Sequence, residues 1–95
     1  MLLAGMAHTS KHKDKLLART RRLKGQMEAI ERALEAGTEC CEILNLVASV
    51  RGAISGLTSE LIQEHIQEHV VGATNRAEME KGAAELVDVI RTYLK

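Results

Sequence analysis

The segment from Cys40 to His69 constrains this chain more than any other, because its apolar residues keep one helical period throughout. The apolar residues recur at steps of four and three, at Ile43, Val47, Val50, Ile54, Leu57 and Leu61. Such a stripe is typical of an amphipathic helix that packs against a partner. Cys40 precedes the stripe by three residues and His65 continues it by four. A thiol and an imidazole are therefore expected on or beside the packing face.

The two ends of this helix cannot meet within one chain. Cys40 and His65 are 25 residues apart (65 − 40), which is about 37 Å along a helix that rises about 1.5 Å per residue. A zinc or nickel ion lies about 2.0–2.3 Å from each ligand. Two antiparallel copies would bring Cys40 of one chain to His65 and His69 of the other, with a twofold axis near residues 53–54. Small residues there would allow close approach: Ser49, Gly52, Ala53, Ser55 and Gly56.

The rest of the chain predicts two further helices. A heptad pattern marks a helix over residues 11–35, with apolar positions at Leu16, Leu23 and Ile30. Gly37 should end it as a C′ residue, and Thr38 should cap the next helix. A third helix is expected after an Asn75–Glu78 pair that resembles a capping box. The fold class is therefore all-α, with three helices, a flexible tail over residues 1–10 and a single domain over residues 11–95.

The composition favours a helix bundle that oligomerises. The 95 residues include no proline, phenylalanine or tryptophan and a single tyrosine. A chain this short buries a modest share of its surface, and oligomerisation is a usual remedy for a thin core. No apolar run is expected to approach the ~18 residues of a membrane span. The adjacent Cys40 and Cys41 are poorly placed to bridge each other, which favours reduced thiols in the cytoplasm.

A net charge of zero conceals a strong asymmetry. Residues 1–24 carry seven Lys or Arg and one Asp (7 − 1 = +6), and the remainder carries 6 − 12 = −6. The basic segment indicates a polyanionic partner, although a solvated helix face is the ordinary alternative. It lacks the interleaved aromatic residues that stack on single-stranded bases. No phosphate loop, nucleophile elbow or spaced acid–base pair indicates an enzyme.

Cys40 with His65 and His69 forms a candidate metal-ligand set. Histidines four residues apart share one face of a helix, and thiolate with imidazole suits Ni(II), Co(II), Zn(II) or Cu rather than Mg or Ca. The alternative is a pair of solvated histidines at a helix end and a cysteine that only packs. Cys41 points about 100° away from Cys40 around the helix and is expected to have no role in the site.

Several motifs resemble the CsoR/RcnR family of bacterial effector-responsive repressors. They are RRLKGQMEAIERAL, the cysteine that starts the second helix, SVRGAISGL and the final His-x-x-x-His, and the resemblance extends from Met6 to Lys95. It implies antiparallel four-helix-bundle dimers that pair into a dimer-of-dimers tetramer. It also implies cytoplasmic repressors that bind double-stranded operator DNA without a helix-turn-helix. An effector releases the DNA and derepresses an efflux or detoxification gene.

The family's branches differ at four positions, which here read His8, Cys40, His65 and His69. This set resembles the nickel/cobalt-responsive RcnR-type branch, which implies Ni(II) or Co(II) as effector, with Zn(II) and Cu(I) as alternatives. The copper branch would have cysteine in place of His69. The formaldehyde branch resembles the first helix closely but typically has proline after the initiator methionine and no histidine at position 69. Whether Met1 or Met6 is the native start, and hence whether an N-terminal amine is a ligand, stays open.

The resemblance assigns DNA contacts to Arg19, Arg22 and Arg51. Further phosphate contacts are expected from Lys11, Lys13, Lys15 and Arg21. Two other functions remain in view: a formaldehyde-responsive repressor that uses Cys40 and an amine on the same scaffold, and a helical metal-storage or trafficking protein that binds no DNA.

Overall fold

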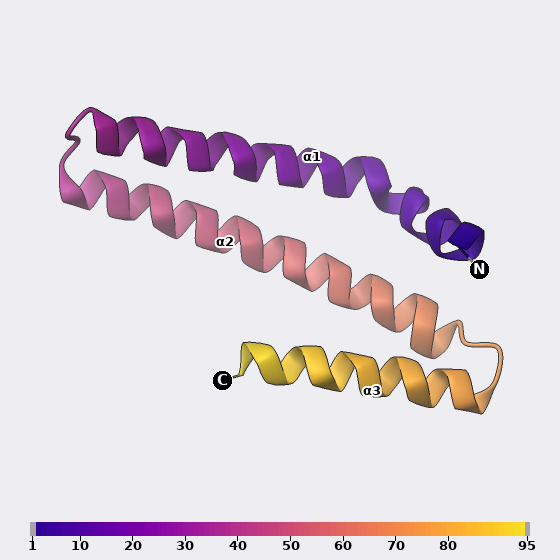
Figure 1. Cartoon of the computed structure of the whole chain (residues 1–95). Coiled ribbons are helices and arrows are strands. Elements are labelled where there is room, and N and C mark those ends of the chain that lie inside the picture. The colour runs from indigo at the N-terminus through magenta and orange to yellow at the C-terminus, as the bar shows by residue number, and fades with distance from the viewer. Residues whose placement is uncertain (1, 95) are drawn as a thin grey trace. The chain divides into compact units, whose positions relative to one another are not determined.

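The computed structural model describes residues 2–94, with side chains from residue 12 onward. Its elements are α1 (Leu2–Glu35), α2 (Cys40–His65), a π-helical segment η1 (Ile66–Val71) and α3 (Arg76–Tyr93) (Figure 1). No strand occurs within residues 2–94. The prediction of an all-α fold with three helices is confirmed, with the second helix prolonged by η1.

Helix α1 begins well before the predicted boundary near Lys11. The structure places its first residue at Leu2, within the segment that was predicted to be a flexible tail. The segment lacks proline and is rich in leucine, alanine and methionine, which favour helix. The division into a tail of residues 1–10 and a single domain of residues 11–95 stays a prediction.

The turn between α1 and α2 is a Schellman motif. Gly37 has a φ of 70°, and its N–H donates to Leu34 O at 3.2 Å, while Thr38 N–H donates to Ala33 O at 3.0 Å. Gly37 is therefore the C′ residue, as predicted. The N-cap prediction was wrong by one residue. Thr38 closes α1 through its own N–H, and Glu39 O accepts the first bond of α2, from Ile43 N–H at 3.2 Å.

The chain divides into two units, residues 1–57 and 58–95, and the division falls within α2. In the first unit α1 and α2 run antiparallel side by side (Figure 1). Gln26 Nε2 donates to Ser49 Oγ at 3.1 Å. A Cβ on Gly56 would lie 2.6 Å from Arg19 Nη1. The second contact is seven residues further along α2 and seven residues back along α1, as antiparallel helices require.

This contact changes the role predicted for Gly56. The sequence indicated a crossing point between two copies of α2, whereas in this chain the missing side chain makes room for the Arg19 guanidinium. Gly52 does have open space where its Cβ would be, with no atom within 4 Å. The close approach of a second chain at Gly52 and Gly56 stays a prediction, and within this chain the Arg19 guanidinium lies beside Gly56.

The core of the single chain is thin. Val50 is the only buried hydrophobic residue among those described, with 7% of its surface exposed. Along α2, the side chains of Leu44, Val47, Ile54 and Leu61 keep 58, 44, 48 and 48% exposure. An aliphatic stripe left open to this extent is typical of a surface that another protein molecule covers.

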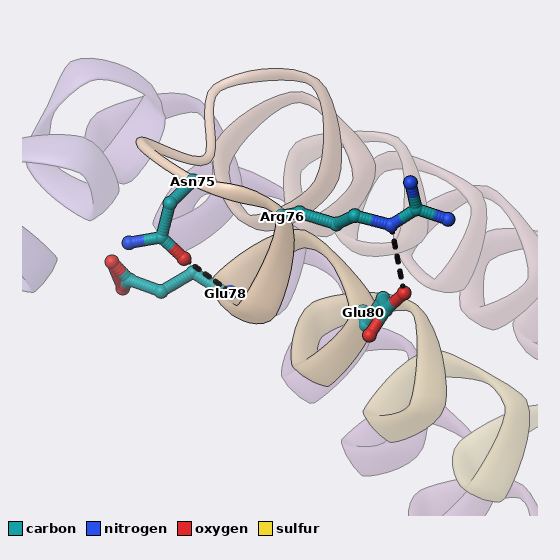
Figure 2. Close-up of polar contacts among 4 residues, drawn as sticks. All are labelled: Asn75, Arg76, Glu78 and Glu80. Atoms are coloured by element: carbon teal, nitrogen blue, oxygen red, sulfur yellow. Dashed lines mark hydrogen bonds and ion pairs between the residues drawn. The ribbon is translucent and has the colours of Figure 1, made fainter.

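In the second unit, α3 packs on η1. Gly82 is buried against the backbone of His69, and a Cβ there would clash with the carbonyl of that residue. Asn75 Oδ1 accepts the Glu78 N–H at 2.9 Å, which confirms the predicted cap of α3 (Figure 2). The Glu78 carboxylate accepts from Thr74 Oγ1 at 2.8 Å. The cap and this bond fix where α3 begins beside η1.

Within the described residues, one helical stretch, Cys40–Val71, is long and apolar enough by composition to cross a membrane, with a mean hydropathy of 1.3 over an 18-residue window. The sequence predicted that no apolar run would be this long, and the helix Cys40–Val71 differs from that prediction. This test depends on length and composition alone, and a helix whose apolar face packs on protein passes it as well. The stretch is interrupted by five charged residues: Glu42, Arg51, Glu60, Glu64 and Glu68.

Candidate functional site

His65 and His69 lie together at the junction of α2 and η1. His65 is the last residue of α2, His69 lies inside η1, and their ring centroids are 4.8 Å apart with planes inclined by 44°. The π-helical character of η1 is visible in the bond from Gly72 N–H to Gln67 O at 2.9 Å, which spans five residues. Such segments are rare and frequently occur at functional sites. The predicted pairing of the two imidazoles on one face is present.

The ring of His65 is held by α3. His65 Nε2 lies 2.8 Å from Gly82 O. A carbonyl oxygen can only accept a hydrogen bond, so Nε2 is the nitrogen that carries hydrogen in this contact. Nδ1 is then the nitrogen that can offer a lone pair to a metal ion in the neutral ring.

Cys40 lies at the opposite end of α2, as its first residue, and is exposed. Steps of four and three along α2 place Cys40, Leu44, Val47, Ile54, Leu61 and His65 in one stripe. Cys41 is also exposed and falls outside that stripe. The exposed aliphatic face of α2 therefore carries a thiol at one end and an imidazole at the other.

One chain does not assemble the predicted set of four ligands. Among the described residues, no three His, Cys, Asp or Glu side chains lie close enough to hold a metal ion. The side chain of His8 is outside the described residues. The donors that are present, two imidazoles and a thiol, match the preferences of Ni(II), Co(II) and Zn(II).

Most of the predicted DNA-contacting residues are exposed on the first unit. Arg19 is half-buried against Gly56, and Lys11 is outside the described side chains. The exposed members are Lys13, Lys15, Arg21, Arg22 and Arg51. The Gln26–Ser49 hydrogen bond sets the register of the two antiparallel helices. In that register Arg51 of α2 lies at the level of Lys24 of α1, so its positive charge adds to that of α1.

Sequence reasoning missed Gly82. Glycine inside a helix costs up to about 1 kcal/mol relative to alanine, so an interior glycine often marks a close approach of two backbones. The signal was present in the stretch KGAAEL, between helix-forming residues. Its partner, the backbone of His69, could not be read from the sequence.

Comparison with known proteins also relates the chain to metal-sensitive repressors. A family model described as metal-sensitive transcriptional repressor matches residues 12–92. A Serratia marcescens protein described by its place in the bioA 5′ region is 45% identical over 95% of this chain and 100% of its own length. The transcriptional repressor RcnR of Salmonella paratyphi B is 37% identical with the same coverage.

Among solved structures, the chain is similar to a variant of the formaldehyde-responsive regulator FrmR of Salmonella enterica serovar Typhimurium. The TM-score is 0.80 at 43% identity, and the match covers 87% of this chain and 94% of that one. That variant has histidine in place of a glutamate. Similarity of this extent concerns the whole helical scaffold and not an isolated motif.

Proposed function

Because the chain belongs to the family of metal-sensitive transcriptional repressors, we propose that it represses a metal-efflux gene and is released from operator DNA by Ni(II) or Co(II). The observation that carries this proposal is the pair His65 and His69, 4.8 Å apart, at one end of an exposed stripe that begins with Cys40. The soft thiolate and the borderline imidazoles suit these ions. Zn(II) and Cu(I) are the alternatives that the same donors would accept.

The proposed ligand set is His8, Cys40, His65 and His69. Two chains that pack antiparallel through the α2 stripe would supply Cys40 from one chain and the histidine pair from the other. Such a homodimer would also cover the aliphatic side chains that the single chain leaves open. Two dimers would then pair into a tetramer, which enlarges the basic surface available to DNA.

The proposed DNA-binding surface consists of exposed cations in the first unit. The charge asymmetry, +6 over residues 1–24, supports contact with the phosphates of double-stranded DNA in the cytoplasm. Its members are Lys11, Lys13, Lys15, Arg19, Arg21, Arg22 and Arg51.

Release of DNA requires that the effector favour one form of the protein over another. An effector that bound both forms equally would shift nothing. Ligands drawn from two chains and two helix ends satisfy this requirement, because the site is complete only in one arrangement of the dimer. A coupling of about 1–3 kcal/mol between effector and DNA is typical of such systems.

A second candidate function is a formaldehyde-responsive repressor. The specific observation that favours it is the 43% identity to FrmR, which is described as formaldehyde-responsive. In that case the Cys40 thiol and an amine would react with the aldehyde, and His69 would have no chemical role. His69 therefore distinguishes the two functions.

One experiment tests both. The chain is titrated onto a fluorescent fragment of its own upstream DNA, and Ni(II), Co(II), Zn(II), Cu(I) and formaldehyde are added in parallel. We expect binding in the low-salt buffer and release by Ni(II) or Co(II) at the lowest concentrations. Release by formaldehyde alone would replace the metal proposal with the second candidate. A chain that binds metal but never the DNA would be a storage or trafficking protein instead.

A further inference from the structure

Two polar residues lie in the face of α1 that packs against α2. Half-buried residues recur along this face at steps of three and four, and five of them in succession are Leu16, Arg19, Leu23, Gln26 and Ile30. Positions that face a second helix are ordinarily apolar, as the two leucines and the isoleucine are. Arg19 is therefore a cation at a helix–helix contact rather than on the solvated face of α1.

Small residues of α2 lie opposite both polar residues. Gln26 Nε2 donates to Ser49 Oγ at 3.1 Å, and a Cβ on Gly56 would lie 2.6 Å from Arg19 Nη1 and 3.7 Å from Arg19 Cζ. Both pairs fit one antiparallel register, since the seven residues between them along α2 are matched by seven residues back along α1. The guanidinium of Arg19 thus lies against the backbone of α2, at a point where glycine leaves no side chain in its way.

From this packing we propose that Gly56 is a positioning residue for DNA binding: because it has no side chain, the Arg19 guanidinium rests on α2 in one orientation, in which it binds a DNA phosphate. The inference rests on the proposed DNA binding by Arg19, and it adds an uncharged residue of α2 to that function. A guanidinium binds phosphate through two parallel N–H bonds, so its orientation matters as well as its charge. A side chain that is already held in its bound orientation also loses less entropy on binding.

Gly56→Ala is a suitable probe because it displaces the guanidinium without removing a charge. Among the described residues, the added methyl group would meet only the far end of the Arg19 side chain, which can move, and no backbone of α1. Alanine also has a higher helix propensity than glycine, so α2 is not weakened. The variant is therefore expected to fold with the same number of basic residues as the wild type.

The test is a double-mutant cycle of DNA affinity. The wild type, Gly56→Ala, Arg19→Ala and the double variant are titrated onto the fluorescent upstream DNA fragment at several salt concentrations. We expect Gly56→Ala to bind about tenfold more weakly, the effect of losing one hydrogen bond to a charged group. It should also reduce the slope of log K against log salt concentration by about 1, as the loss of a phosphate contact does, although no charge is removed.

The cycle identifies Arg19 as the residue through which Gly56 acts. The double variant should bind no more weakly than Arg19→Ala alone, since the methyl group then has no guanidinium to displace. Wild-type affinity and slope in Gly56→Ala would overturn the assignment. An equal loss from Gly56→Ala with and without the Arg19 side chain would overturn it too, because the glycine would then act elsewhere, for instance where two chains meet.

Gly52→Ala is the matched control, one turn earlier on the same helix. It adds the same methyl group where no atom of the chain lies within 4 Å. Its effect on DNA affinity should be the same in the wild-type and Arg19→Ala backgrounds, because it does not reach the guanidinium. Coupling of Gly52→Ala to Arg19 as strong as that of Gly56→Ala would contradict a specific role for Gly56.

The failure of this role and the failure of the proposed function give different results. If the wild type does not bind the upstream DNA, the proposed repressor function is wrong, and the role of Gly56 is wrong with it. If the wild type binds and Arg19→Ala weakens binding while Gly56→Ala does not, the DNA-binding surface stands and only the role of Gly56 is wrong.

Discussion

His69 is the residue whose substitution separates a metal effector from an aldehyde. Its imidazole lies 4.8 Å from that of His65 and would be a ligand, whereas a thiol–aldehyde–amine crosslink has no use for it. We expect His69→Ala to lower Ni(II) or Co(II) affinity at least tenfold, about 1.4 kcal/mol, as measured by competition with a chelator. Cys41→Ala, the control, should change little because Cys41 lies outside the stripe. Full metal affinity in His69→Ala would contradict its place in the ligand set.

Cys40 should be required for either effector, because a thiolate can bind a metal and can also attack an aldehyde. Cys40→Ala should therefore abolish release of DNA by any effector while DNA binding itself survives. The measurement is the titration of the variant onto the fluorescent DNA fragment, with each effector added in turn. Release of DNA that persists in Cys40→Ala would remove this thiol from both candidate mechanisms.

Each exposed cation of the proposed DNA-binding surface should contribute separately to DNA affinity. Arg22→Ala and Arg51→Ala each remove an exposed cation and should weaken binding while leaving metal affinity nearly intact. Each should also reduce the slope of log K against log salt concentration by about 1, because fewer counterions are released. Arg91→Ala, in α3, removes a cation of the same type outside the proposed surface and should have no such effect. If the salt dependence of DNA binding had the same slope in Arg22→Ala, Arg51→Ala and Arg91→Ala, the proposed DNA-binding surface would be wrong.

At the level of elements, the turn after α1 depends on one backbone conformation. Gly37 has a φ of 70°, which costs a residue with a Cβ about 1–2 kcal/mol. Gly37→Ala should therefore lower the urea midpoint without changing the m-value. Gly25→Ala, in the interior of α1 with open space around it, should raise the free energy of unfolding by about 0.4–1 kcal/mol and the midpoint with it. Both are compared at one protein concentration, since dissociation would couple to unfolding. A Gly37→Ala chain as stable as the wild type would show that the turn tolerates another conformation.

For the whole molecule, the antiparallel dimer makes a prediction about crosslinks. In a Cys40→Ser, Cys41→Ser background, Ile54→Cys lies near the proposed axis and should form a disulfide with its own copy under mild oxidation. Leu44→Cys should not, because the two copies would lie about 28 Å apart. It should instead crosslink when mixed with Leu61→Cys, on the partner. Parallel chains would give the reverse, with Leu44→Cys crosslinked to itself.

The sequence by itself determined the helices and most of their ends. Apolar periods of three and four residues give α2 and α3, because such spacing buries one face of a helix. Gly37 and Asn75 were recognisable because a left-handed C′ residue and an N-cap each favour particular side chains. The charge asymmetry and the spacing of His65 and His69 are properties of the chain alone.

Only the tertiary structure decided which backbones touch. Gly56 leaves room for the Arg19 guanidinium of the same chain, and Gly82 lies against η1. Both contacts join residues that are distant in sequence, so no local periodicity could predict them. The hydrogen bond from His65 to Gly82 depends on the angle at which α3 returns along η1, and that angle follows from packing. The nitrogen that His65 can offer to a metal was therefore invisible in the sequence, while the residues that would bind the metal were not.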